Sequence, residues 1–210
     1  TTDVLKSTEK LQDTVLDEIV GRIKQTDMSV PYKDNGYYYY TRYEEGKEYP
    51  VYCRKKGDIN GDEEIILNVN ELAEGYSYYN VAGYTVSPDN KMIAYGVDTL
   101  SRRIYILHFK NLETGEILEE RIENTTGRAS WGNDNKTLFY SSKDEQTLRS
   151  NQIYRYALGG GESSELIYQE DDETFSCYVF KSRSKKYIII GSSATLSDEY
   201  RILEADKPNG

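Results

Sequence analysis

Few residues in this sequence could carry out hydrolysis. A catalytic triad needs an exposed serine or cysteine, a histidine as base and a carboxylate. The 210 residues hold one histidine, His108, and no G-x-S-x-G nucleophile elbow. His108 lies in RIYILHFKNL, which has the composition of a β-strand, so we expect a structural or surface role. This stretch of sequence therefore predicts no triad of its own.

Metal and phosphate motifs are equally weak. Zinc sites need closely spaced Cys and His residues, and the sequence has no such pairs. DINGDEE (58–64) resembles the start of a calcium loop, but Val69 stands where the bidentate glutamate belongs, so we expect a solvated turn. GGG (159–161) lacks the lysine and helix of a phosphate cradle and predicts a hairpin. We expect no cofactor and no metal.

The composition limits the partners. Net charge is −10, with 37 % hydrophobic and 30 % charged residues. Phosphate contacts require clustered Lys and Arg, so we expect no nucleic-acid partner. An acidic surface could attract basic peptides, although such a charge also serves solubility alone. No apolar run approaches the ~18 residues of a membrane span, and we expect no membrane partner.

Two cysteines, Cys53 and Cys177, do not form a disulfide framework. A reducing compartment is therefore expected, and we place the protein in the cytoplasm. The N-terminus has no apolar signal-peptide core and does not begin with Met. We expect the sequence to be part of a longer chain.

Helical periodicity occurs once, over residues 8–25. Apolar residues recur there on one face, with Ser7 as the expected N-cap: Leu11, Val15, Leu16, Ile19, Val20 and Ile23. The polar face is mixed rather than rich in Lys and Arg, which argues against a membrane-surface helix. We expect residues 1–27 to form an amphipathic helical segment that docks on an apolar partner.

Beyond residue 27 the sequence repeats itself. Similar segments, each a polar turn followed by a four-residue strand core, stand at DNGYYYYT (34–41), DNKMIAYG (89–96), DNKTLFYS (134–141) and SKKYIIIG (184–191). A second run with a tyrosine follows each core, and the first three copies have a third run. A further run precedes three of the cores, at NVAGYTV (80–86), GRASW (127–131) and CYVF (177–180). Short strands at such a period are typical of β-propeller blades.

The run Tyr37–Tyr40 could be an aromatic ligand platform or a buried strand. It occupies the place of MIAY (92–95) and YIII (187–190) in the other copies. Strands covered on both faces are continuously apolar, so we favour the buried strand.

The repeat predicts a mainly β fold: a partial β-propeller of about three and a half four-stranded blades, preceded by the one amphipathic N-terminal helix. The copies hold three, four, four and three strands, in the ranges 30–70, 76–124, 127–170 and 175–206 of a propeller portion spanning 28–210. Closed rings have at least four blades, so we expect an arc of a larger ring.

Several segments together resemble the oligopeptidase B (protease II) branch of the prolyl oligopeptidase family of serine peptidases. They are GRIKQTDMSVPYKDNGYYYYTRYEEGKEYPVYCRKKG (21–57), NELAEG (70–75), VSPDNKMIAYGVDTLSRRIYILHFKNLETGEIL (86–118), WGNDNKTLFY (131–140) and YQEDDETF (168–175). The resemblance implies a seven-bladed propeller that caps an α/β-hydrolase domain, admits short peptides and serves cleavage after Lys or Arg. It also implies that the triad lies in the hydrolase domain, which has no counterpart here.

The resemblance implies a partner surface as well, because one face of the propeller would meet the parent's own hydrolase domain. Two charged loops are candidates for this interdomain surface: DTLSRR (98–103) and SKDEQTLRSN (142–151). The alternative is that both loops are simply solvated. The residues in question are Arg102, Arg103, Asp144, Glu145 and Arg149. Short basic peptides would be the substrates of the whole enzyme.

Apolar end copies predict that the fragment self-associates, since terminal repeats normally carry polar capping faces. A free-standing β-repeat binding module without enzymatic activity remains the alternative function. A reading frame that continues to a G-x-S-x-G elbow would favour the peptidase.

Overall fold

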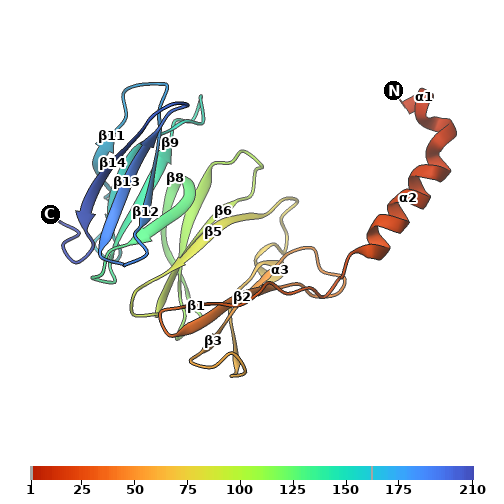
Figure 1. Ribbon diagram of the computed structural model, residues 1–210, viewed down its shortest axis with the longest axis horizontal. Coiled ribbons are helices and arrows are strands. Elements are labelled where there is room, and N and C mark those ends of the chain that lie inside the picture. Colours follow the sequence, from red (N-terminus) through yellow and green to blue (C-terminus); the bar gives the residue numbers. More distant parts are fainter. Residues whose placement is uncertain (1, 162) are drawn as a thin grey trace. The chain divides into compact units, whose positions relative to one another are not determined.

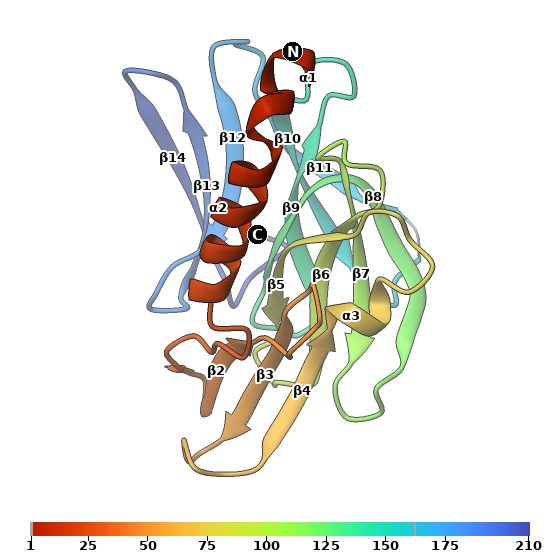
Figure 2. The same ribbon diagram turned by 90° about the vertical axis from the view of Figure 1, so that its right-hand side faces the viewer.

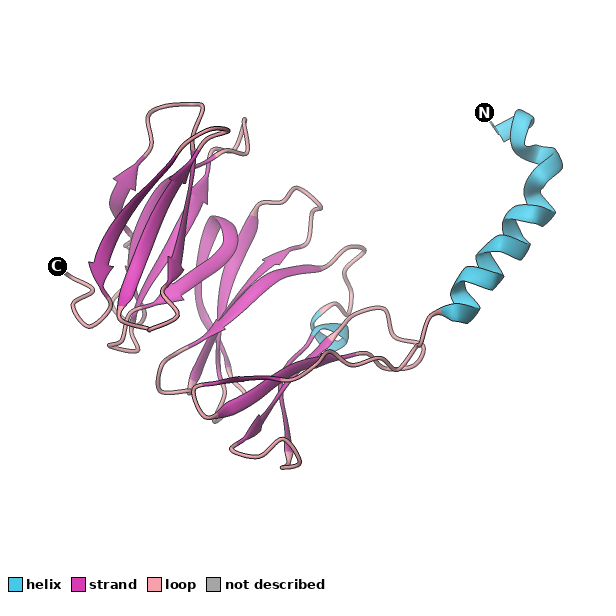
Figure 3. Cartoon of the chain, viewed as in Figure 1, coloured by secondary structure: helices cyan, strands magenta, loops and turns pink. Residues whose placement is uncertain are grey.

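The computed structural model describes residues 2–161 and 163–210 and is mainly β, with one N-terminal helical stretch (Figures 1 and 3). The chain divides into two compact units. The first unit ends at Leu72, and the second runs from Ala73 to Gly210. No helix within the described residues is long and apolar enough to cross a membrane.

The first unit begins with the helical stretch, which comprises α1 (Thr2–Leu5), a 3-10 turn (Lys6–Thr8) and α2 (Glu9–Arg22). The predicted helix is confirmed, but its bounds were too wide at the C-terminal end. Ile23 has an extended backbone with ψ at 123° and stops the helix. The predicted Ser7 N-cap is wrong, because Ser7 lies inside the 3-10 turn and the cap residue is Thr8. All described residues of α2 are solvent-exposed.

A four-stranded antiparallel sheet follows, in the order β1-β2-β3-β4. Its strands are β1 (Tyr32–Asp34), β2 (Tyr37–Arg42), β3 (Val51–Lys56) and β4 (Glu63–Asn68), and the short helix α3 (Val69–Leu72) closes the unit. The tyrosine run is β2, as predicted, with Tyr39 and Tyr40 each 3 % exposed. The first copy has four strands rather than the predicted three. Sequence patterning missed β1 because three residues are too short to show a period.

The second unit contains a seven-stranded sheet in sequential order from β5 to β11. Its strands are β5 (Asn80–Val86), β6 (Met92–Asp98), β7 (Tyr105–Asn111), β8 (Ile117–Trp131), β9 (Thr137–Lys143), β10 (Ser150–Ala157) and β11 (Glu165–Gln169). A three-stranded sheet completes the unit, with β12 (Ser176–Lys181), β13 (Tyr187–Ser193) and β14 (Asp198–Glu204). Strand β12 packs on β8, β9 and β10 (Figures 1 and 2).

Strand β8 joins two of the predicted repeats. Its first half pairs with β7 and its second half with β9, so two expected runs form one continuous strand. The strand bends where Asn124 and Gly127 take positive φ values of 57° and 80°. Glycine tolerates this conformation, and a Cβ on Gly96 would lie 2.2 Å from the Gly127 Cα atom. The bend therefore depends on direct backbone contact between β6 and β8.

The core of the second unit lies between the two repeats that β8 connects. Its large buried side chains include Leu107, Phe109, Trp131, Leu138 and Tyr156. The Phe109 ring stacks on Tyr156 at 6.1 Å and meets Trp131 edge-on at 6.4 Å. Trp131 donates its indole N–H to the Thr85 carbonyl at 3.1 Å, which ties β8 to β5.

Equivalent turns of successive repeats are hydrogen-bonded to one another. The backbone N–H of Asp89 donates to Asn135 Oδ1 at 2.8 Å. One repeat further, Asn133 Nδ2 donates to the Lys185 carbonyl at 3.1 Å. The D-N turns that marked the repeat in the sequence therefore also connect its copies in space.

Candidate functional site

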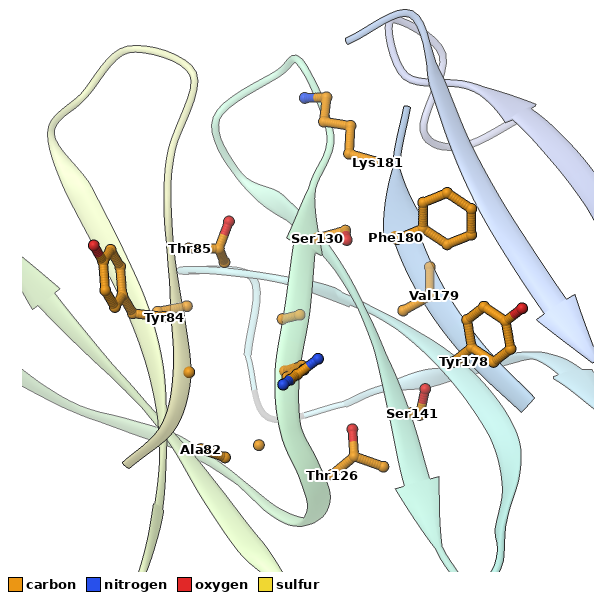
Figure 4. A pocket seen from close by; sticks show the side chains of 15 residues that line it. Ala82, Tyr84, Thr85, Thr126, Ser130, Ser141, Tyr178, Val179, Phe180 and Lys181 are labelled. Atoms are coloured by element: carbon orange, nitrogen blue, oxygen red, sulfur yellow. The ribbon is translucent and has the colours of Figure 1, made fainter. Parts of the chain in front are cut away.

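The second unit has an open cleft of about 740 Å³ along β5, β8 and β12 (Figure 4). These are the first strands of their repeats, the strands that line the central channel of a propeller. The lining residues are Ala82–Thr85, Ala94, Thr126–Ser130, Ser141 and Tyr178–Lys181. Hydroxyl groups, small side chains and aromatic rings dominate the surface.

Arg128 is the exposed cation of this cleft. A Cβ on Gly83 would lie 3.7 Å from Arg128 Cγ and 3.8 Å from Nε. The side chain therefore lies across the bare backbone of β5 at Gly83. Within residues 2–161 and 163–210, its guanidinium has no hydrogen-bond or ion-pair partner.

The other cation, Lys181, is engaged in the framework. Its ammonium group donates to the Trp131 carbonyl at 2.9 Å and to Asn133 Oδ1 at 2.5 Å. It thereby connects β12 to the end of β8. Lys181 contributes charge to the cleft, but its donors are committed to protein oxygens.

An aromatic edge borders the cleft on β12. Tyr178 and Phe180 stack at 6.0 Å and are 37 % and 39 % exposed. The Tyr178 ring rests on Gly191, where a Cβ would approach it within 2.5 Å. The hydrogen bond with the Tyr200 hydroxyl raises the pKa of Tyr178 to about 12, so the phenol stays neutral near pH 7.

The two charged loops of the sequence analysis lie beside one another in the second unit. Lys143 Nζ donates to the Arg103 carbonyl at 2.6 Å and thereby joins them. Asp98 holds the first loop by accepting from the N–H groups of Leu100 and Arg103 at 2.8 and 2.7 Å. Arg102 is exposed on this loop.

In the second loop, Asp144 accepts from the N–H groups of Gln146 and Thr147 at 3.1 and 2.7 Å. These bonds, the Thr147 backbone bond foremost, lower the pKa of Asp144. Glu145 projects into solvent at the tip. Arg149 instead points toward the β11–β12 connection and donates to the carbonyls of Asp172 at 2.9 Å, Phe175 at 2.8 Å and Glu170 at 3.2 Å.

His108 lies on β7, as predicted, and stacks on Tyr95 with ring centroids 5.6 Å apart. Burial, together with the nearby Arg121, lowers its pKa, so the imidazole is neutral at pH 7. Among the described residues it has no hydrogen bond to a serine, cysteine or carboxylate. The geometry of its surroundings fits the structural role.

The calcium-like segment forms the expected turn between β3 and β4. Asp58 Oδ1 accepts from the Asn60 N–H at 2.9 Å, and the Asp58 carbonyl accepts from Gly61 at 3.1 Å. Such local bonds are typical of Asx turns. GGG (159–161) likewise lies in the hairpin between β10 and β11.

Sequence reasoning missed the cleft and Arg128. The run GRASW that contains Arg128 was identified only as a strand preceding a blade core. The available signal was its place in the repeat, because the first strand of each copy faces the channel of a propeller. Only the fold brings the three first strands together.

Comparisons with known proteins agree with this architecture. Residues 1–210 match the family described as the prolyl oligopeptidase N-terminal beta-propeller domain. The chain is 40 % identical to dipeptidyl aminopeptidase BI of Pseudoxanthomonas mexicana and 31 % identical to protease 2 of Moraxella lacunata. Each match covers 98 % of this chain and 31 % of the relative, so the chain spans about a third of their length.

Solved structures of the same family share this fold. Oligopeptidase B from Leishmania major superposes with a TM-score of 0.91 at 31 % identity. Oligopeptidase B from Trypanosoma brucei, in a closed form with covalently bound antipain, gives 0.88 at 30 % identity. Both matches cover 98 % of this chain and 29 % of the solved chain. The chain therefore belongs to the prolyl oligopeptidase family, as part of its N-terminal β-propeller domain.

Proposed function

We propose that this chain is the substrate-filtering propeller portion of a serine oligopeptidase that cleaves short peptides after Lys or Arg. The observation that supports it most is the end-to-end match to oligopeptidase B, with a TM-score of 0.91 over 98 % of the chain. The open cleft along the channel-side strands supplies a surface along which a peptide could pass. The closed form of the trypanosomal enzyme is consistent with gating.

In this proposal the copies at 30–70, 76–124, 127–170 and 175–206 are blades, and residues 1–27 are a helical segment. The exposed ends of the loops, at Arg102 and Glu145, face the hydrolase domain of the same protein. The whole enzyme is cytoplasmic. Cys53 and Cys177 are free and buried, which fits a reducing compartment. Burial raises the pKa of each thiol to about 12, so both thiols stay protonated near pH 7.

A second activity has a specific observation in its favour. The relative that is 40 % identical is named a dipeptidyl aminopeptidase, which removes dipeptides from a free amino end. The whole protein would then require an unblocked N-terminus two residues before the cleaved bond. A free-standing binding module remains the alternative outside the peptidases.

The protein encoded by the complete reading frame tests these proposals. We expect it to hydrolyse an N-terminally blocked arginine amide with a fluorogenic leaving group, and to leave the matching glutamate amide intact. Cleavage restricted to unblocked dipeptide amides would assign the aminopeptidase activity instead. Absence of both activities and of labelling by a serine-directed fluorophosphonate would favour the binding module. The 210-residue chain alone is the matched control and should remain unlabelled.

A further inference from the structure

The cleft along β5, β8 and β12 has a charge opposite to that of the chain. The whole sequence carries a net charge of −10. The charged residues that line the cleft are Arg128 and Lys181, and no carboxylate lies among the lining residues. A positive recess in an acidic protein attracts anions over neutral or cationic groups.

Arg128 is positioned to bind rather than to hold the fold together. Its stem lies over Gly83, and its guanidinium has no hydrogen-bond or ion-pair partner among the described residues. Guanidinium groups match carboxylates through two parallel N–H donors. The hydroxyl groups of Thr126 and Ser130 line the same strand of the cleft and could complete such a site.

The aromatic edge on β12 suggests that the anionic ligand also carries an apolar or aromatic group. Tyr178 and Phe180 are stacked and partly exposed beside the cleft. Apolar side chains of a peptide whose carboxylate lies in the cleft could pack along this edge of β12. The carboxyl end of a peptide combines both groups.

We propose that this cleft is a carboxylate subsite that binds the C-terminal end of peptides, with Arg128 as its main ligand. The inference rests on the proposed function, because it makes peptides the class of ligand that passes through the propeller. It is also consistent with basic substrates, since the cations of the cleft would repel a Lys or Arg side chain and favour the opposite end of the peptide.

Binding to the 210-residue chain, at a concentration where light scattering shows it to be monomeric, provides the test. The probes are N-acetyl-Ala-Phe with a free carboxylate, the same peptide as its amide, and N-acetyl-Glu-Phe amide, whose carboxylate is on a side chain. The Arg128 side-chain N–H signal is followed by NMR during titration. We expect binding of the free-carboxylate peptide about threefold to fivefold tighter than of the amide, as for an accessible ion pair.

Arg128→Gln should abolish that preference. Arg183→Gln, which removes the same charge from the exposed β12–β13 turn, should keep it. Equal binding of acid and amide by the unmodified chain, or an unchanged preference in Arg128→Gln, would overturn the proposal. Equal binding of N-acetyl-Glu-Phe amide would overturn the assignment to the C-terminus. The test needs no catalysis, so a failure of the proposed peptidase activity would be seen separately.

Discussion

Arg149 and Glu145 lie on the same loop but have different surroundings. Arg149 donates to three backbone carbonyls of the β11–β12 connection, whereas Glu145 is exposed at the tip. The sequence suggested both as contacts to a second domain. The structure makes Glu145 the cleaner reporter, because a change at Arg149 also disturbs the packing of the loop.

We therefore expect Arg149→Ala to destabilise the chain by about 2 kcal/mol, the usual effect of losing charged hydrogen bonds. Glu145→Lys should leave the melting temperature unchanged and alter kcat/KM of the full-length enzyme. Thermal melts of both variants, with steady-state kinetics, separate the two roles. Unchanged kinetics in Glu145→Lys would mean that the loop is only solvated.

Glu170 is one residue through which the folded chain should lose stability as the pH falls. It accepts hydrogen bonds from Ser192 and from Tyr168, the latter at 2.6 Å, and these bonds lower its pKa. Its stabilisation is therefore complete above the unfolded pKa of ~4.3 and is lost as pH falls through the lower folded value.

Glu170→Gln should accordingly lower stability by about 1 kcal/mol at pH 7, and the difference from the unmodified chain should shrink toward pH 3. Melting temperatures across this range provide the measurement. Glu173→Gln, in the same acidic turn, is the control and should have no comparable effect. A deficit that persists unchanged at pH 3 would contradict the assignment.

At the scale of elements, the repeat in the sequence located the inner strands well. The segments at 89–96, 134–141 and 184–191 fall on β6, β9 and β13, because buried strands are continuously apolar. Sequence could not show that β8 is one strand, since its bend depends on contact between Gly96 and Gly127. The same limitation hid the cleft, whose lining residues come from five strands.

The helix α2 is the element least supported by its surroundings. Its apolar residues are exposed, with Leu11 at 63 %, Leu16 at 58 % and Ile19 at 54 %. A 14-residue helix without tertiary contacts is marginally stable in water. We therefore expect the helix to need its docking partner in order to stay folded.

We expect amide hydrogens of α2 to exchange much faster than those of β6 and β9 in the 210-residue chain. In the full-length protein the same amides should become protected. Hydrogen exchange followed by mass spectrometry makes the comparison, with the exposed turn at 57–62 as a segment that should exchange quickly in both. Protection of α2 equal to that of β6 in the short chain would show that it needs no partner.

At the scale of the whole molecule, the sheet β12–β13–β14 presents a large apolar face. Its exposed side chains are Tyr178, Phe180, Tyr187, Tyr200 and Ile202, at 37 to 67 % exposure. Strand β14 pairs with β13 on one side only among the described strands, which leaves a free edge. Burial of a few hundred Å² of such a surface is worth several kcal/mol at about 25 cal/mol per Å².

We therefore expect the 210-residue chain to self-associate, most simply as a two-fold dimer that pairs these faces. Light scattering across a dilution series should show a mass that falls toward the monomer at low concentration. Ile202→Asp, which places a charge on the exposed face, should shift that transition to higher concentration. Glu199→Asp retains the charge of the same strand and should not. A chain that stays monomeric throughout the micromolar range would contradict the prediction, because the exposed apolar side chains of this face would then be tolerated in water without a partner.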